Sequence, residues 1–418
     1  MNLTFCSLNR TFVTMKVGII GAGAAGCFCA IELKRRMPEA EVIVFERGRK
    51  PLAKVAITGG GRCNLTNSFR EIKHLQQAYP RGWRLMQRIF AQFSPQATYE
   101  WWEEAGVPLI TQDDECVFPR SQDAMQVVGT LLRLMQTSGV KIMTNSRIDE
   151  VGRNYVKYNS VTESFDSIMI TTGGSPRTSG LSFLAPLDLA IEQPVPSLFA
   201  LNTGDEGLHA LSGAVIDNAV VSIAGTKMRA EGPLLITHFG MSGPAILRLS
   251  SYAARLLAEK DYRVTLTINW MQGRNEEQVR QMFDVFANSS KQVSNQHPQH
   301  ITARHWSYIL QRAGIPESQR WDSLNQKERN RLIATLTSDA YPTDGRRTYK
   351  AEFVTCGGIA LSNINPNTLE CRQHPDIYFA GEVLDVDAIT GGFNLQAAWS
   401  MGYVAAQSIA DKALNKNV

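Results

Sequence analysis

The stretch Val17–Gly26, which reads VGIIGAGAAG, decides the fold of this chain. Val17 to Ile20 form an apolar run that predicts a buried strand, and Gly21, Gly23 and Gly26 follow it with the spacing G-x-G-x-x-G. In a strand–turn–helix unit, the first glycine permits the tight turn, the second lets a pyrophosphate approach the backbone, and the third lets helix and strand pack closely. The motif predicts a dinucleotide-binding turn. The alternative is a glycine-rich turn in an ordinary α/β domain.

The residues around this turn agree with a nucleotide site. A helix expected over residues 24–37 would direct its N-terminal amide groups toward phosphates. The next apolar run, VIVFE at 42–46, ends in Glu46, 20 residues after Gly26. A carboxylate at the end of the second strand accepts hydrogen bonds from ribose hydroxyls and repels a 2′-phosphate. The motif alone is compatible with NAD and with FAD.

Composition and charge describe a folded protein of ordinary surface. The chain has 418 residues, of which 44% are hydrophobic and 20% charged, enough for two or three domains. Its net charge of +4 is small for this length, so no nucleic-acid partner is expected. Seven scattered cysteines favour reduced thiols and a cytoplasmic protein. No apolar stretch reaches the ~20 residues of a membrane span, and no membrane partner is expected.

The order of predicted elements indicates an α/β protein with insertions. Residues 15–192 and 349–418 should form one Rossmann-like domain from both ends of the chain, with 139–151 adding to its parallel sheet. Residues 193–273 and 336–348 should form a β-rich inserted domain, and residues 274–335 a helical insert. Residues 1–14 are expected to be a disordered extension. The closing helix, about residues 392–411, carries small residues suited to packing on the first strand.

Four further segments place glycines where a ligand can approach the backbone. The segment TGGGRCN, within a glycine-rich loop expected over residues 54–68, combines glycines with donors for phosphates or ring carbonyls. FAGE ends an apolar strand in an acid, and TGGFNLQ places glycines at a helix start whose positive end suits an electron-rich ring. TTGG is a weaker signal of the same kind. Their alternatives are a surface turn, a plain strand end or a simple helix cap. The segments lie at residues 58–64, 379–382, 390–396 and 171–174.

No residue stands out as a catalytic acid or base. Cys63 and His238 are weak candidates, for a redox thiol and for a substrate or flavin contact. Cys63 has no C-x-x-C partner, and His238 also suits a capping or core role. Asp385 and Asp387 form either a paired acid site or a solvated turn. No metal site is expected.

Several longer motifs together resemble a known family. KVAITGGGRCNLTN, FPRSQDAMQVV, THFGMSGPAIL, CGGIALSNINPNTLE and FAGEVLDVDAITGGFNLQAAWSMG are similar to the BaiN/YhiN-type family of bacterial FAD-dependent flavoproteins, from Met15 to the end. The resemblance implies an α/β fold: a Rossmann-like FAD domain of the two-dinucleotide-binding type, an inserted β-barrel-like domain and a helical subdomain. It selects FAD over NAD as the cofactor.

The resemblance also implies which residues hold FAD. The pyrophosphate would lie on the glycine turn, the adenosine ribose at Glu46 and adenine near the backbone of Ile148. The other segments would lie near the rest of the cofactor and its ring. The full predicted set is Gly21, Gly23, Ala24, Ala25, Gly26, Glu46, Arg47, Lys54, Gly60, Gly61, Arg62, Cys63, Asn64, Ile148, Thr172, Gly173, Gly381, Glu382, Gly391, Gly392, Phe393, Asn394 and Leu395.

One region departs from the family pattern. Relatives carry a longer loop after the strand that ends in T-G-G, with a G-D-G element, whereas here Gly174 is followed by Ser175, Pro176 and Arg177, and the G-D-G is absent. The shortened loop puts the wall on the substrate side in doubt.

The resemblance implies an oxidoreductase with hydride transfer at flavin N5. The implied reactions are NAD(P)H-dependent reduction of an unsaturated ketone, including bile-acid-like steroids, or oxidation of an amine. The chain has no second G-x-G-x-x-G, so NAD(P)H would bind transiently at the flavin face, or electrons would come from elsewhere. The alternatives are a flavin-binding redox sensor or RNA-associated flavoprotein without small-molecule turnover, and an NAD-only dehydrogenase. Substrate and oligomeric state stay open.

Overall fold

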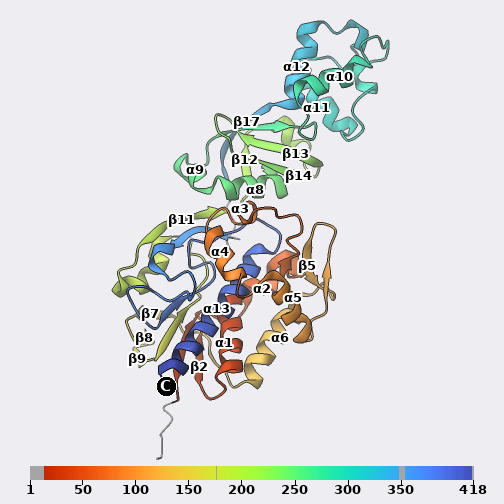
Figure 1. The fold of residues 1–418 in the computed structure, drawn as a ribbon. Helices are drawn as coiled ribbons and strands as arrows, with labels where there is room; N and C mark the ends of the chain where they lie inside the picture. Colours follow the sequence, from red (N-terminus) through yellow and green to blue (C-terminus); the bar gives the residue numbers. More distant parts are fainter. Residues whose placement is uncertain (1–13, 176, 348–353, 417–418) are drawn as a thin grey trace, which may run out of the picture. The chain divides into compact units, whose positions relative to one another are not determined.

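The computed structural model describes residues 14–175, 177–347 and 354–416 (Figure 1). The chain forms two compact units, and each is assembled from separate segments. Unit 1 comprises residues 1–193, 357–386 and 391–418, and unit 2 comprises residues 194–356 and 387–390. The extension predicted over residues 1–14 lies outside the described residues except for Thr14, and the predicted Rossmann-like segment 349–418 is described from residue 354 to residue 416.

A parallel five-stranded sheet forms the centre of unit 1, in the order β19-β10-β1-β2-β6. Its strands read as continuous apolar runs because a parallel sheet is buried on both faces. β19 comes from the C-terminal part of the chain and pairs with β10, which pairs with β1. The Rossmann-type fold is thereby confirmed. The strands are β1 (Lys16–Ile20), β2 (Glu41–Phe45), β6 (Lys141–Met143), β10 (Ser167–Ile170) and β19 (Ile377–Phe379).

The closing helix packs against the first helix of unit 1. α13 (Phe393–Lys416) and α1 (Ala24–Arg36) lie side by side (Figure 1). At Gly402 the fit is so close that a Cβ atom would lie 2.7 Å from the carbonyl oxygen of Ala25. The small residues of α13 therefore serve close helix–helix packing on α1, whereas the sequence pointed to the first strand.

Two small antiparallel sheets complete unit 1. One has the order β3-β5-β4, and the other consists of β7, β8 and β9. The segment 139–151 was predicted to join the parallel sheet as a whole, and only β6 does so. At Asn145, with φ +52°, the chain turns, and β7 begins the antiparallel sheet instead. The strands are β3 (Thr66–Asn67), β4 (Leu109–Thr111), β5 (Cys116–Pro119), β7 (Ile148–Val151), β8 (Tyr155–Tyr158) and β9 (Val161–Ser164).

Shorter helices surround these sheets. Two of them, α4 and α5, are amphipathic. The helices are α2 (Ala53–Ile57), α3 (Leu75–Ala78), α4 (Trp83–Phe90), α5 (Pro95–Glu104), α6 (Ala124–Thr137) and the 3₁₀-helices η1 (Thr58–Gly61) and η2 (Thr178–Leu187). Among the described residues, no helix is both long enough and apolar enough to cross a membrane.

Unit 2 is built on a closed six-stranded barrel in the order β12-β15-β14-β13-β16-β17, which confirms the predicted barrel-like insertion. Along each strand, buried apolar residues alternate with exposed ones because side chains point in turn to opposite faces. Helix α8 (Pro244–Tyr252) lies on β14 and β13. The strands are β12 (Leu201–Thr203), β13 (Val215–Ile223), β14 (Arg229–Thr237), β15 (Gly240–Ser242), β16 (Thr265–Asn269) and β17 (Asp339–Arg346).

A helical insert between β16 and β17 is joined to the barrel through buried polar groups. The guanidinium of Arg312 forms an ion pair with Asp339 at 2.6 Å, and the indole N–H of Trp270 donates to the same carboxylate at 3.1 Å. Because the buried carboxylate of Asp339 is bonded by both Arg312 and Trp270, the insert has a defined orientation on the barrel. The helices of the insert are α10 (Glu276–Asp284), α11 (Ala303–Ala313) and α12 (Gln326–Thr337). Two further helices, α7 (Glu206–His209) and α9 (Ala254–Glu259), flank the barrel. The strands β11 (Ile191–Ser197) and β18 (Val354–Ile359) link the two units along the chain.

Candidate functional site

The three glycines of the first turn meet three different steric demands. At Gly21, with φ +107°, a Cβ atom would lie 2.5 Å from the carbonyl oxygen of Thr171, and at Gly26 it would lie 2.1 Å from that of Gly21. At Gly23, by contrast, no atom lies within 4 Å of the added Cβ. The outer two glycines are thus required by the fold itself, whereas Gly23 leaves open space above the N-terminus of α1. That space is where a diphosphate approaches the backbone in this motif.

Glu46 borders this turn at the end of β2. Its carboxylate accepts hydrogen bonds from the backbone amides of Ala22, at 3.2 Å, and Gly48, at 2.7 Å. These bonds hold the acid beside the glycine turn, and a carboxylate has lone pairs left for ribose hydroxyls. The backbone carbonyl of Glu46 accepts from Ser146, two residues before Ile148 at the start of β7. The predicted ribose and adenine contacts are therefore neighbours.

The TGGG segment is a 3₁₀-turn between α2 and β3, not part of one long loop as predicted. Gly59, Gly60 and Gly61 have φ values of +56°, +69° and +85°, which L side chains rarely adopt. No atom lies within 4 Å of a Cβ added at Gly60 or Gly61. The turn therefore exposes backbone without side chains, which suits contact with a flat ring or a phosphate.

Arg62 presents a positive charge beside this turn. Its guanidinium lies 4.4 Å from the centre of the Phe118 ring and donates to the carbonyl of Gly59, at 3.2 Å, and to Gln122, at 3.4 Å. Within the described part of the chain it forms no ion pair. The side chain is thus oriented by neutral partners and retains its charge for an anionic ligand.

Cys63 is completely buried, and this burial raises the pKa of its thiol to about 12. A thiol with that pKa is protonated at neutral pH, and only the thiolate is a competent nucleophile. The geometry therefore gives no support to Cys63 as a redox thiol. Its position in the turn, with φ +61°, is structural.

The start of α13 is bonded directly to the TGGGRCN segment. The amide of Asn64, oriented by its partners, donates to the carbonyl of Thr66 at 2.9 Å and accepts from the N–H of Gly392 at 3.2 Å. The buried amide of Gln396 accepts from the hydroxyl of Thr66 and donates to Thr98 and Ser400, each at 2.8 Å. The backbone amide of Gly392, predicted to be available for the cofactor ring, is thus engaged within the chain.

The remaining predicted segments meet at one edge of the parallel sheet. β1, β10 and β19 are neighbours and run in the same direction, so the residues after them gather at their carboxyl ends. There the ammonium of Lys54 lies 3.5 Å from the carboxylate of Glu382, and that carboxylate lies 3.8 Å from a Cβ placed at Gly173. A Cβ at Gly381, with φ +80°, would lie 3.2 Å from the Cβ of Ala25. The glycine turn, Lys54, Gly173 and Glu382 therefore surround one place.

Other candidates lie elsewhere. His238 belongs to unit 2, in the exposed turn between β14 and β15, where its ring contacts Phe239 edge-on at 5.0 Å. Asp385 belongs to unit 1 and Asp387 to unit 2. Asp387 is buried and accepts from the hydroxyl of Ser197 at 3.1 Å. Because Asp387 is buried, the segment that carries the two acids is not a solvated turn.

The shortened segment after Gly174 continues into the 3₁₀-helix η2. Its leucines at 181, 184 and 187 are buried, and the carbonyl of Leu187 is hydrogen-bonded to the ring of His374 at 2.8 Å. The segment is therefore packed into unit 1 in place of the longer glycine loop of the family pattern.

Sequence reasoning missed the residues that position the site. Tyr79 donates its hydroxyl to the carbonyl of Phe393 at 2.8 Å, and Thr66, Thr98 and Gln396 form the buried network at the start of α13. Gln396 stood in a motif singled out for its glycines. In the sequence, the one signal of a hydrogen-bonded role is a polar residue beside small residues on an otherwise apolar helix, because such a helix is expected to be buried.

These residues fit FAD. Open backbone at Gly23 suits the diphosphate, Glu46 suits the ribose, and the side-chain-free turn at Gly60 and Gly61 suits the flat ring. Lys54 adds a cation at the edge of the parallel sheet, and Arg62 adds one beside the TGGG turn.

Comparisons with known proteins find relatives over nearly the whole chain. The family model described as "HI0933-like protein Rossmann domain" matches residues 15–408. Curated relatives include the 3-dehydro-bile acid delta(4,6)-reductase of Clostridium scindens, 26% identical over 95% of this chain and 99% of that protein. The ribosomal RNA dihydrouridine synthase of Escherichia coli is 28% identical over 94% of this chain and 97% of that protein. The synthase of Haemophilus influenzae is 27% identical over 94% and 98%.

Among solved structures, a variant of the E. coli quinol fumarate reductase subunit FrdA resembles the chain. The TM-score is 0.50 at 14% identity, covering 96% of this chain and 71% of that one. At this level of identity the likeness concerns the fold.

Proposed function

The chain belongs to the HI0933-like Rossmann family of FAD-dependent oxidoreductases, and from this premise we propose that it reduces a carbon–carbon double bond conjugated to a carbonyl group. The observation behind the proposal is that two kinds of curated relative match nearly the whole chain. One is named for removing the delta(4,6) unsaturation of a 3-oxo steroid, and the other for forming dihydrouridine. In both reactions an unsaturated carbon conjugated to a carbonyl accepts a hydride, and its neighbour accepts a proton.

FAD would supply the hydride from N5 of its ring. The protein's part is to bind and orient the cofactor. Gly23 and the N-terminus of α1 would receive the diphosphate, and Glu46 the adenosine ribose. The positive end of α13, fixed by the bond between Asn64 and Gly392, would favour negative charge on a ring beside it. Lys54, held by Glu382, adds a cation to the same edge.

For the electron donor we propose NAD(P)H. The reaction is then balanced, since NAD(P)H and one proton reduce one double bond and leave NAD(P)⁺. With one glycine fingerprint in the sequence, used for FAD, the nicotinamide would bind transiently at the flavin face, without a dinucleotide domain of its own.

For the substrate we propose a uracil base within RNA. The ribosomal RNA dihydrouridine synthases of two organisms match 94% of this chain. The small net charge favoured no nucleic-acid partner, but a substrate bound through a local surface does not require a basic protein overall. A 3-oxo-4,6-diene steroid is the second candidate, favoured by the similarity to the bile-acid reductase.

A two-step anaerobic experiment tests the proposal. The purified holoprotein is first titrated with NADH and NADPH while the flavin absorbance is followed, and bleaching is expected with at least one of them. The reduced protein is then mixed with a uridine-containing RNA transcript or with a 3-oxo-4,6-diene steroid, and in a separate experiment the oxidised protein is mixed with a primary amine. Reoxidation by the RNA, with dihydrouridine in the digested product, is the expected result. Bleaching without reoxidation by RNA or steroid would contradict the proposed reduction and favour a redox sensor. Bleaching of the oxidised protein by the amine alone would favour amine oxidation.

A further inference from the structure

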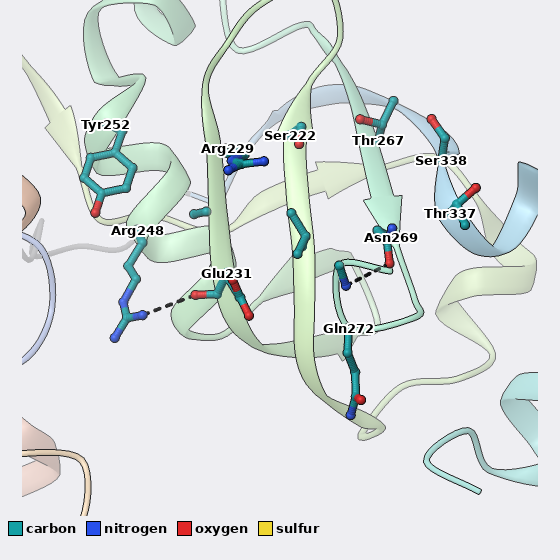
Figure 2. Close-up of a pocket in the computed structure, with 13 residues that line it drawn as sticks. Ser222, Arg229, Glu231, Arg248, Tyr252, Thr267, Asn269, Gln272, Thr337 and Ser338 are labelled. Carbon is teal, nitrogen blue, oxygen red and sulfur yellow. Dashed lines mark hydrogen bonds between the residues drawn. The ribbon is translucent and has the colours of Figure 1, made fainter. Parts of the chain in front are cut away.

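Unit 2 contains a polar hollow of about 700 Å³ on the outside of its barrel (Figure 2). Its floor is formed by β14, β13 and β16, which are adjacent in the barrel. Helix α8 forms one side, and the end of α12 with the turn after β16 forms the other. The volume is in the range of ~300–1,000 Å³ that is usual for ligand pockets. We call this feature the barrel trough; all of its lining residues belong to unit 2.

Strand register explains why the floor is polar. Ser222 pairs with Arg229 on one side and with Thr267 on the other, which gives one row of side chains across the three strands. Val220, Glu231 and Asn269 form the next row in the same way. Residues two apart on a strand share a face, so both rows point outward while their neighbours point into the apolar core. Inward neighbours of the rows, such as Val221, Leu266 and Ile268, are buried.

Two arginines give the barrel trough its positive charge. Arg229 is exposed on the floor, and Arg248 extends from α8 at the side, as Figure 2 shows. Arg248 donates to the backbone carbonyl of Glu231 at 3.2 Å, while its buried Nε–H has no hydrogen-bond partner among the residues that the structure describes. Within the described part of the chain, neither guanidinium is in an ion pair. With Glu231 as the one carboxylate of the lining, two positive charges and one negative charge leave a net charge of +1.

The other lining groups are mostly hydrogen-bonding side chains. Ser222, Thr267, Thr337 and Ser338 bring hydroxyl groups, and Tyr252 adds a phenol whose pKa burial raises, so it remains a neutral donor. Asn269 is used internally, since its amide fixes the turn after β16 through Met271 and Gly273. A lining of this kind does not match a steroid, whose surface is almost entirely apolar, but it matches a ligand with phosphate oxygens and sugar hydroxyls.

We propose that the barrel trough binds the phosphodiester backbone of the RNA substrate, with Arg229 and Arg248 each contacting a phosphate. The inference rests on the proposed function, since it names a second binding surface for the substrate whose base is reduced. An unpaired arginine is suited to this contact because its planar fork matches phosphate oxygens. Such contacts are independent of base sequence and depend on salt.

The test measures binding of a fluorescently labelled, uridine-containing RNA hairpin to the holoprotein by anisotropy at several salt concentrations. Arg229→Gln and Arg248→Gln should each weaken binding and lower the slope of log K against log salt by about one, because each variant leaves one phosphate unneutralised. Arg229→Lys keeps the charge and should restore most of the slope. Arg263→Gln is the matched control: Arg263 is exposed in unit 2 but outside the lining, and its variant should bind as the wild type does.

FAD content and melting temperature check that each variant is folded. Because Arg248 is half-buried, its variant can lose stability, and the exposed Arg229 then decides the test alone. Unchanged RNA affinity and salt slope in Arg229→Gln would overturn the proposal. A raised KM for NADPH with unchanged RNA binding would also overturn it and make the barrel trough a donor site. If the wild-type protein binds no RNA yet reduces the dienone steroid with NAD(P)H, the inference fails while the proposed reduction of a conjugated double bond stands.

Discussion

Individual glycines in the turn after β1 differ in what limits a side chain there. A Cβ atom added at Gly21 or Gly26 would lie closer to backbone atoms than van der Waals contact allows, so any side chain there would displace the turn itself. Gly23 has an ordinary φ of −89° and open space around it. The fold therefore does not explain Gly23, whereas a ligand above it does.

Gly23→Ala should leave the apoprotein folded but weaken FAD binding. The methyl group would occupy the space of the diphosphate, at a cost of about 1–3 kcal/mol, roughly tenfold to a hundredfold in Kd. Gly129→Ala is the matched control, since Gly129 lies within α6 with no atom within 4 Å of an added Cβ. It should raise stability by about 0.5–1 kcal/mol without changing FAD affinity. Kd is measured by flavin fluorescence on reconstitution; equal affinities for the two variants would contradict the assignment.

Cys63 should resist alkylation in the folded protein. With a pKa of about 12 and no exposure, its thiol should not react with iodoacetamide at pH 8, while the unfolded chain should react readily. The raised pKa also gives stability that is complete below the ordinary thiol pKa near 9 and is lost as pH rises from there toward 12. Mass spectrometry of the peptide containing residue 63 measures the labelling. Fast labelling under native conditions would restore Cys63 as a redox candidate.

Among the structural elements, α13 connects the site to the rest of unit 1. Its first turn contacts the TGGGRCN segment through Asn64, and Gln396 continues the connection to β3 and α5. A buried amide with three partners fixes the rotation of the helix about its axis. The orientation of the TGGFNLQ segment therefore depends on a hydrogen-bond network behind it.

Gln396→Leu should destabilise the protein by about 2–3 kcal/mol, because it leaves buried hydroxyls at Thr66 and Thr98 without their partner. FAD affinity should fall as well, since the start of α13 loses its anchor. Gln407→Leu, at a half-buried position of the same helix, is the control and should change stability by less than about 0.5 kcal/mol. Chemical denaturation gives both values. A loss in Gln396→Leu no larger than that in the control would show that the network is unimportant.

Signals in the sequence predicted the turns, strands and helices that depend on residues adjacent in the chain. The spacing of Gly21, Gly23 and Gly26 was sufficient, since the turn, the strand and the helix are adjacent in the chain. The order of strands and helices likewise predicted the Rossmann-type fold and a β-rich insertion, and the family resemblance implied that the insertion is a barrel. The partners of Gln396 were out of reach, because Thr66 and Thr98 lie some 300 residues away in the sequence. The short α2 and the turn at Asn145 were not predicted, because tertiary hydrogen bonds determine them. One such bond runs from the backbone amide of Asn145 to the carbonyl of Gly48.

At the scale of the whole molecule, a buried titratable group in unit 2 makes stability depend on pH. In unit 2, burial among apolar side chains, with the nearby charge of His300 as a second cause, lowers the pKa of His305 to about 4. The ring of His305 packs edge-on against Trp270 at 4.6 Å, and in the described part of the chain its Nε2 has no hydrogen-bond partner. Folding therefore requires a neutral imidazole there.

Acid should destabilise the protein through His305. An unfolded histidine takes up a proton near pH 6.5, whereas the folded one does so only near 4, so its contribution is complete above pH 6.5 and is lost as pH falls through this window. The loss is at most about 1.4 kcal/mol per pH unit. His305→Phe should flatten the fall in melting temperature between pH 7 and pH 5, and His238→Gln, at an exposed position, should not. Equal pH profiles for wild type and His305→Phe would contradict this role.

The interleaved segments of the two units have a consequence for biosynthesis. A ribosome synthesises β1, α1 and β2 before the inserted barrel, whereas the strand β19 and the helix α13, which extend their sheet and pack on α1, are synthesised after it. The nascent Rossmann segment therefore keeps apolar surface exposed to chaperones until α13 has been made. Chains that terminate before α13 should lack a complete flavin cradle, so retention of the yellow cofactor would mark molecules in which α13 has been synthesised.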